Sequence, residues 1–195
     1  MLHEKCPDCL MGRRLISLDI ETTGLSRHCH IIELGVVEVV SGKVVREYSK
    51  LFGGGHSPVY LVRNVHHIPD SDRAGKPTFS ECAGRIASYL SGAVLVTHNG
   101  NSFDIPMIQG KLKEAGEELR DVKSLDTLQL VRRMRKASEG DGRRQSNSLG
   151  SVCREFGLSY GGDDGSRAHR GLEDAEAALD LLFHLVNSRK VDVSV

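Results

Sequence analysis

Residues 15–24, with the sequence LISLDIETTG, constrain the fold more than any other stretch of the chain. Apolar and polar side chains alternate in it, which is the pattern of a β-strand, and its apolar positions include Ile16, Leu18 and Ile20. The period of two places Asp19 and Glu21 on the same face, about 7 Å apart. Neighbouring carboxylates on a strand repel each other, so a divalent cation that compensates their charge is one interpretation. Two exposed acids on an edge strand are the alternative.

The patterns downstream of this strand predict a mixed α/β fold. Further strands are expected at 31–40, 43–52, 93–97 and 122–125. The first two are joined by Ser41-Gly42, a hairpin signal that predicts an antiparallel meander of three strands. Helices are expected over 79–90 (behind a Thr78–Glu81 capping box), 104–116, 126–135, 149–157 and 171–188. Alternating helices and strands after a meander predict an α/β sheet with additional parallel strands, flanked by helices.

The chain of 195 residues is long enough for one domain with a proper core. We expect this domain at 13–189, between an N-terminal tail at 1–12 and a C-terminal tail at 190–195. Two glycine-rich stretches within it, 53–55 and 161–165, are expected to form mobile loops.

The N-terminal tail contains one CxxC pair, Cys6 and Cys9. A structural zinc site needs four ligands, and a second CxxC is absent from the sequence. The histidines and the cysteine that offer further ligands are His3, His28, Cys29 and His30. The sequence favours a flexible tail with two free thiols and leaves a zinc site as the alternative.

Composition excludes several classes of protein. An odd number of cysteines, five, favours reduced thiols and therefore a cytoplasmic or nuclear location. The longest purely apolar run, 93–96, is far too short to span a membrane, and the N-terminus shows no secretory signal. The formal net charge is zero, which argues against a protein that coats nucleic acid through bulk positive charge. A net charge of zero is compatible with an enzyme that binds only the end of a nucleic-acid strand.

Two further acids and one histidine lie in suggestive places. Asp104 opens a helix behind a buried strand and the polar pair His98-Asn99. Asp174 lies in the first turn of the last helix, five residues after His169. Acids in the first turn of a helix commonly complement the helix dipole, and an isolated histidine is more often a packing residue than a base.

Taken together, these segments resemble the three motifs of the DEDDh 3′→5′ exonucleases. The motifs are DIETTG (19–24), HNGNSFDIP (98–106) and HRGLED (169–174), and the resemblance extends in order from about Arg14 to Val186. The histidine five residues before the last acid matches the histidine branch of the family. The segment 98–109 is similar to the three-prime repair (TREX-type) exonucleases. The segments 65–68 and 146–149 are closer to the polymerase III epsilon-type proofreading exonucleases and RNase T.

The resemblance implies an RNase H-like sheet and two Mg²⁺ or Mn²⁺ ions, held by Asp19, Glu21, Asp104 and Asp174. Four carboxylates carry a formal charge of −4, which two divalent ions neutralise, and hard oxygen ligands suit Mg²⁺. By the same resemblance Asp19 bridges the two ions. His169 acts as the general base that deprotonates the attacking water. The implied reaction is the release of nucleoside 5′-monophosphates from a single-stranded 3′ end, with DNA favoured over RNA.

The resemblance also implies which residues contact the substrate. Leu25 matches a position that wedges against the terminal base, and Ile68 is expected in the same pocket, although ordinary core packing is the alternative for both. The backbone of Thr22 and Thr23 is expected to meet the terminal 3′-hydroxyl, and Arg170 a phosphate. The full set of expected substrate contacts is Thr22, Thr23, Gly24, Leu25, Ile68, His98, Asn99, Phe103 and Arg170. A basic stretch at 132–144 is either a phosphate contact or a solvated loop.

Two other functions are compatible with these motifs. One is an RNA-trimming exoribonuclease or oligoribonuclease with the same chemistry. The other is a catalytically inactive, nuclease-like binding module recruited through the Cys6–Cys9 tail. The expected partners are a single-stranded DNA or RNA end and either a second copy of the chain or a polymerase or repair complex.

Overall fold

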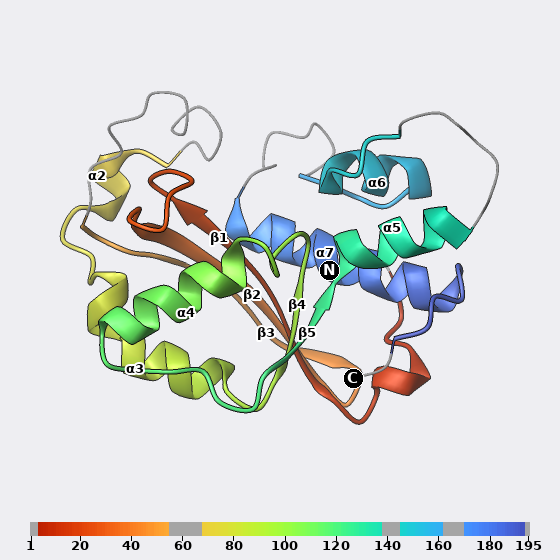
Figure 1. The fold of residues 1–195 in the computed structure, drawn as a ribbon, viewed down its shortest axis with the longest axis horizontal. Coiled ribbons are helices and arrows are strands. Elements are labelled where there is room, and N and C mark those ends of the chain that lie inside the picture. Colours follow the sequence, from red (N-terminus) through yellow and green to blue (C-terminus); the bar gives the residue numbers. More distant parts are fainter. Residues whose placement is uncertain (1–3, 55–67, 138–144, 162–169, 194–195) are drawn as a thin grey trace.

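The computed structural model describes residues 4–54, 68–137, 145–161 and 170–193 (Figure 1). Its strands are β1 (Arg14–Thr22), β2 (Ile31–Val40), β3 (Lys43–Leu51), β4 (Val94–Thr97) and β5 (Lys123–Asp126). Its helices are η1 (Asp8–Leu10), α2 (Asp70–Arg73), α3 (Phe79–Leu90), α4 (Asp104–Glu114), α5 (Thr127–Ala137), α6 (Leu149–Phe156) and α7 (Gly171–Asn187).

The five strands form one mixed sheet in the order β3-β2-β1-β4-β5. The pairs β1–β2 and β2–β3 are antiparallel, whereas β1–β4 and β4–β5 are parallel. This arrangement confirms the predicted fold class, a meander extended by parallel strands. The strand that carries the two acids lies in the middle of the sheet, so the alternative of an edge strand is wrong.

The hairpin and the capping box predicted from the sequence are both present. Ser41 and Gly42 join β2 to β3 with φ angles of 51° and 73°. Two consecutive positive φ angles are typical of the tight turn that matches the twist of a hairpin. At the start of α3, the Thr78 side chain accepts a hydrogen bond from the backbone N–H of Glu81, and the Glu81 carboxylate accepts one from the N–H of Thr78.

Helices cover both faces of the sheet (Figure 1). On one face, α3 and α4 pack against the residues of β1 that point toward them, Ile16, Leu18 and Ile20. On the other face, α5, α6 and α7 pack against a second apolar cluster that includes Leu15 of β1. The alternation predicted for β1 is therefore confirmed, and it directs Asp19 and Glu21 to the side of α7.

The described part of the N-terminal tail is packed against the domain, which corrects the expectation of a flexible segment. Leu10 is fully buried and Cys6 is 5% exposed. The Asn187 side-chain amide of α7 donates a hydrogen bond to the carbonyl of Lys5, and Glu4 pairs with His184 of the same helix. Apolar burial explains the difference, because Leu10 extends the core between the sheet and α7. The domain boundaries at 12/13 and 189/190 stay a prediction.

The glycine run after β3 is also less free than expected. The N–H of Gly53 donates to the carbonyl of Pro77, and a Cβ on Gly53 would lie 2.1 Å from the carbonyl oxygen of Lys76. The carbonyl of Gly54 accepts a hydrogen bond from Arg73. These two glycines allow a close approach of backbones, whereas Gly55 lies outside the described residues, as does 162–165 of the second loop. Among the described helices, none combines the length and apolar character needed to cross a bilayer.

Candidate active site

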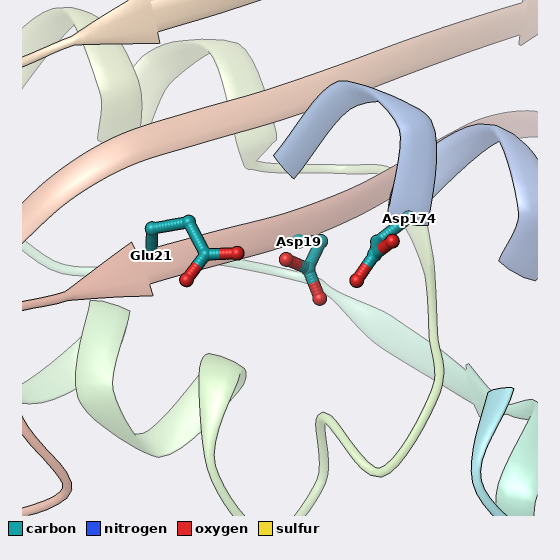
Figure 2. Close-up of side chains that lie close together, drawn as sticks. All are labelled: Asp19, Glu21 and Asp174. Carbon is teal, nitrogen blue, oxygen red and sulfur yellow. The ribbon is translucent and has the colours of Figure 1, made fainter. Parts of the chain in front are cut away.

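Three carboxylates from distant segments meet at one end of β1. Asp19 and Glu21 project from β1, and Asp174 projects from the first turn of α7 (Figure 2). One carboxylate oxygen of each lies within 4.8 Å of the others. Asp19 and Glu21 are half-buried, and Asp174 is 9% exposed. The structure thus brings together three of the four acids expected to bind metal.

Two small-residue contacts allow α7 to approach the sheet closely enough for this. A Cβ placed on Gly35 of β2 would lie 1.9 Å from the carbonyl carbon of Gly171, so the backbones of β2 and α7 are in direct contact. Two residue pairs away along β1 and β2, the hydroxyl of Ser17 in β1 donates a 2.7 Å hydrogen bond to the carbonyl of Ala175. Larger side chains at these positions would push α7, and Asp174 with it, away from β1.

The fourth acid, Asp104, approaches from the other side of β1. It is the first residue of α4 and is 5% exposed, and its carboxylate accepts a 3.1 Å hydrogen bond from the backbone N–H of Ile20. It lies outside the group of three whose oxygens meet within 4.8 Å. Among the charged neighbours of Asp19, however, Asp104 raises the pKa of that carboxyl most. Asp104 therefore belongs to the same acidic centre without sharing the same ligand cluster.

The acidic centre is electrostatically strained. Burial, followed by the charges of Asp104 and Asp174, raises the pKa of Asp19 well above its usual value. Burial and the neighbouring acids raise the pKa of Glu21 to about 9, against a smaller opposing effect of Arg170. Burial raises the pKa of Asp104 to about 7, although the hydrogen bond from Ile20 opposes the shift. In the folded chain, the surroundings of these carboxyl groups therefore favour their neutral, protonated form.

Such a centre fits divalent metal ions. Its donor atoms are all carboxylate oxygens, the hard ligands that Mg²⁺ and Mn²⁺ prefer, and positive charge would relieve the repulsion between them. In the part of the chain that the structure describes, this is the one group of three or more candidate ligands. Cys6 is buried and Cys9 exposed, and neither belongs to such a group, while His3 lies outside the described residues. The zinc alternative thus gains no support.

Asp126, a residue that sequence reasoning did not select, holds the loop in front of Asp104. Its carboxylate accepts hydrogen bonds from the backbone N–H groups of Asn99, Asn101 and Leu128, at 2.9, 3.1 and 3.0 Å. It is 4% exposed and is the last residue of β5. Its bond to Leu128, two residues on, is a helix-capping pattern that was visible in the sequence, but the two bonds across to the 98–101 loop were not.

His98 links two elements that flank the site. Its Nδ1 lies 2.8 Å from the Thr127 hydroxyl, and its Nε2 lies 2.9 Å from the Asn147 carbonyl. Burial lowers the pKa of His98, in spite of the bond to Asn147. Because both ring nitrogens are engaged within the protein, the expected substrate contact of His98 would have to use its carbon atoms or its backbone. Asn99 follows with a positive φ of 69° and is exposed.

A pocket of about 660 Å³ opens beside Asp19 and Asp174. It extends toward α5 and α6, and it brings two arginines, Arg132 and Arg154, to the same cavity as the acids. Arg132 belongs to the basic stretch expected at 132–144, whereas Arg154 was not selected. The other residues that line the pocket are His98, Asn99, Leu128, Asn147, Ser148, Leu149, Gly150, Ser151 and Tyr160. Negative and positive groups thus share one cavity.

Tyr160, also missed by the sequence patterns, contacts an acid of the centre directly. Its hydroxyl forms a hydrogen bond with the Asp174 carboxylate, and burial and this acid raise the pKa of the tyrosine. Its ring lies against the start of α6, where a Cβ on Gly150 would lie 2.7 Å from Cε1 of the ring. No local motif marks Tyr160, because its partner, Asp174, lies in α7.

Hydrogen bonds within the chain hold the turn after β1 in place. The Thr22 hydroxyl donates to the carbonyl of Gly24 at 2.6 Å, and the backbone N–H of Thr23 donates to the carbonyl of His30 at 2.9 Å. The expected contact of a 3′-hydroxyl with the Thr23 N–H would have to displace that bond. Leu25, next in the chain, is 86% exposed, so core packing is wrong for this residue. It projects into solvent from this hydrogen-bonded turn.

The remaining expected contacts differ in accessibility. Ile68 is 2% exposed, which agrees with core packing. Phe103, half-buried, packs against the apolar cluster under α4. Arg170 forms an ion pair with Glu33, so a phosphate contact would have to compete with this pair. His169 lies outside the described residues.

Comparison with known proteins relates this geometry to nucleases. The model of the exonuclease family (RNase_T) matches residues 16–182. The chain is 28% identical over 171 residues to the DNA polymerase III subunit epsilon of Treponema pallidum, covering 87% of this chain and 75% of that protein. It is 28% identical over 166 residues to the 3′-5′ exonuclease DinG of Bacillus subtilis, covering 84% of this chain but only 16% of the relative.

Solved structures share the fold. Escherichia coli exonuclease I in complex with a dT13 oligonucleotide superposes with a TM-score of 0.78 at 15% identity, over 91% of this chain and 42% of the other. Exonuclease X in complex with 5′ overhanging duplex DNA gives a TM-score of 0.63 at 24% identity, over 91% of this chain and 92% of the other. The mixed sheet and its flanking helices are thus those of RNase H-like exonucleases. With its family model extending from β1 into α7, the chain belongs to the exonuclease family.

Proposed function

We propose that this chain is a metal-dependent 3′→5′ exonuclease of the DEDDh type. It hydrolyses single-stranded 3′ ends, with DNA favoured, and releases nucleoside 5′-monophosphates. One observation carries the proposal: Asp19, Glu21 and Asp174, from β1 and α7, meet within 4.8 Å in a setting that raises the pKa of Asp19 and Glu21. A fold has no structural need for such repulsion, so the arrangement favours a catalytic role.

The relatives support the 3′→5′ direction of digestion and DNA as the substrate. One is named a 3′-5′ exonuclease and another a subunit of a DNA polymerase, and two solved neighbours were captured with DNA. The chain spans three quarters of the epsilon subunit, 42% of exonuclease I, and 12% of the PolC-type polymerase of Lacticaseibacillus paracasei. On the basis of these relatives, we propose DNA as the substrate and a polymerase or repair complex as the partner.

Asp19, Glu21, Asp104 and Asp174 would hold two Mg²⁺ or Mn²⁺ ions. When bound, such ions neutralise charge on the phosphate, lower the pKa of water and stabilise the leaving 3′-oxygen. The role of the protein is to hold the carboxylates in place before the substrate arrives. The hydrogen bond from Ile20 fixes Asp104, and the hydroxyl of Tyr160 fixes Asp174. Asp19, which lies between Glu21 and Asp174 in Figure 2, would contribute to holding both ions.

His169 is the proposed general base, since it directly precedes Arg170 at the start of α7. It accepts a proton from the attacking water, which requires a neutral imidazole. Activity should therefore rise with pH as His169 loses its proton.

Replacing this base tests its role. We expect His169→Gln to lower kcat by about 10²- to 10⁴-fold, because a general base contributes a factor of this size. The rise of kcat with pH should disappear together with the base. Single-turnover rates between pH 5.5 and 9 measure both effects. A variant that keeps the wild-type pH profile would show that another group accepts the proton.

The proposed substrate contacts surround the acidic centre. Gly24 and Leu25 form a turn on which the 3′-terminal nucleotide rests, and the exposed Leu25 contacts its base. Asn99 and the two pocket arginines, Arg132 and Arg154, are placed to contact phosphates or sugars. Five further residues support these contacts indirectly, since they are buried or engaged within the protein. They are Thr22, Thr23, Ile68, His98 and Phe103.

Tyr160 offers a test of metal binding that spares the carboxylates. Tyr160→Phe removes only the hydroxyl that binds Asp174, and loss of such an outer partner typically lowers metal affinity by about tenfold or more. We expect the Mg²⁺ concentration for half-maximal activity to rise by about tenfold, with little change at saturating Mg²⁺. Tyr89→Phe is the control, because the Tyr89 hydroxyl binds Glu38 instead. Equal Mg²⁺ dependence in both variants would contradict the role of Tyr160.

Two alternatives keep the same fold. An exoribonuclease or oligoribonuclease would use the same acids on RNA, and an inactive binding module would use none of them. The four acids in place argue against the inactive module. A homodimer and a cytoplasmic or nuclear setting are further expectations, the former from the resemblance and the latter from the five cysteines.

Matched single-stranded DNA and RNA oligonucleotides, labelled at the 5′ end and incubated with Mg²⁺, test the proposal. We expect both to shorten stepwise, with the DNA shortened faster. Equal rates would remove the preference for DNA, and faster trimming of RNA would favour the exoribonuclease. If neither oligonucleotide is shortened, the inactive binding module would be the remaining alternative.

A further inference from the structure

A fifth acid, Glu33, lies beside the centre without belonging to the ligand cluster. It is in β2 directly opposite Glu21 of β1, and it is fully buried. A buried carboxylate is costly unless hydrogen bonds and a positive charge compensate it. Its contacts therefore show what the chain uses it for.

Glu33 accepts four hydrogen bonds, and three of them come from the start of α7. The Arg170 side chain donates through Nε at 3.2 Å and through Nη2 at 3.0 Å. The backbone N–H of Gly171 donates at 3.1 Å, and the Ser49 hydroxyl of β3 donates at 2.5 Å. The two-pronged contact with a guanidinium fixes direction as well as distance.

This contact is continuous with the acidic centre. The backbone carbonyl of Arg170 accepts the first hydrogen bond of α7, at 3.0 Å from the N–H of Asp174. Arg170 is also the residue that follows His169. Gly35, two residues after Glu33, is in backbone contact with Gly171, so α7 has no room to settle closer if the ion pair is lost. One buried side chain thus sets where the first turn of α7 begins.

Resting on the proposed function, we infer that Glu33 is a positioning residue of the nuclease site. It holds Arg170 and Gly171 against β2, and through them it places Asp174. The charge of Arg170 serves Glu33 and is not available to the substrate phosphate.

Kinetics of Glu33→Gln distinguish this role from simple stability. The amide keeps the size of the side chain but removes the charge and turns one acceptor into a donor. We expect kcat to fall by about 10²-fold, as small displacements of catalytic groups do, with KM within about threefold of wild type. Glu47→Gln is the control, since Glu47 is exposed on β3 of the same sheet, and it should behave as wild type.

The double variant with Arg170→Met tests the partnership. If Arg170 acts only through Glu33, the two single variants and the double variant should lose the same activity, a strongly non-additive result. If Arg170 instead binds a substrate phosphate, Arg170→Met should raise KM and its effect should add to that of Glu33→Gln. That second result would overturn the inference.

Hydrogen–deuterium exchange gives a readout that does not depend on activity. The amides at the start of α7, residues 171–175, should exchange at least about tenfold faster in Glu33→Gln than in Glu47→Gln, while β1 stays protected. Unchanged exchange with unchanged kcat would contradict the inference. If the wild-type chain degrades no nucleic acid, the proposed function fails by itself, and the exchange experiment still decides whether Glu33 holds α7.

Discussion

Asp19→Asn is expected to abolish nuclease activity while the fold stays intact. Asp19 lies between Glu21 and Asp174 (Figure 2), and among its charged neighbours Asp104 raises its pKa most, so it is the acid that links the whole centre. An amide in its place has the same shape but cannot carry the charge that balances two divalent ions. We expect kcat in saturating Mg²⁺ to fall by about 10³-fold or more. Release of mononucleotide from a labelled single-stranded substrate measures it.

The stability of the same variant separates catalysis from folding. Burial and four neighbouring acids raise the pKa of the Asp19 carboxyl, so removal of its charge relieves repulsion in the metal-free protein. At pH 8 and without metal, Tm should equal or exceed that of wild type. Asp121→Asn is the matched control, because Asp121 is exposed and its φ of 52° suits asparagine equally well. An Asp19→Asn protein that still digests the substrate would refute the role of this acid.

The second large effect concerns pH and Mg²⁺. In the folded chain the pKa of Asp104 is raised from 3.8 to about 7 and that of Glu21 from 4.5 to about 9. Acids with raised pKa stabilise the fold fully below their unfolded pKa, and this stability is lost as the pH rises through the folded pKa. The metal-free protein should therefore lose stability from about pH 4 to pH 9. Mg²⁺ should reverse this loss, because it binds the deprotonated carboxylates.

Thermal unfolding with Mg²⁺ or with EDTA measures this effect. One pKa unit corresponds to about 1.4 kcal/mol, and 1 kcal/mol to about 2–4 °C in a domain of this size. Without metal we expect Tm to fall by at least about 5 °C between pH 5.5 and 8.5, and the gain from Mg²⁺ to be larger at pH 8.5. Na⁺ at equal ionic strength is the control. A gain from Mg²⁺ that does not depend on pH would contradict the assignment.

Much of the fold and half of the site could be predicted because their determinants are local. The alternation in 15–24 correctly placed Asp19 and Glu21 on one face of a strand. The Ser41-Gly42 turn and the Thr78–Glu81 capping box involve neighbours in the sequence, and both are present. The meeting of Asp174 with this strand required the resemblance to a family, since spacing alone does not bring α7 to β1.

What was missed or wrong depends on contacts between distant segments. Tyr160 and Glu33 read as ordinary residues until α7 is placed against them. The N-terminal segment looked like a tail because its charged and cysteine residues conceal the buried residues, Leu10 among them. Arg170 looked available for a phosphate, yet a buried glutamate in another strand engages it. A sequence pattern records the type of a residue, whereas the partner that determines its role comes from the tertiary fold.

The polarity of digestion tests the central claim most directly. A single-stranded DNA labelled at its 5′ end should shorten one nucleotide at a time with Mg²⁺, and the label should stay on the long products until late. EDTA should stop the reaction, and the released product should be a nucleoside 5′-monophosphate. Early release of the label as a mononucleotide, internal cleavage, or undiminished activity in EDTA would contradict a metal-dependent 3′→5′ exonuclease.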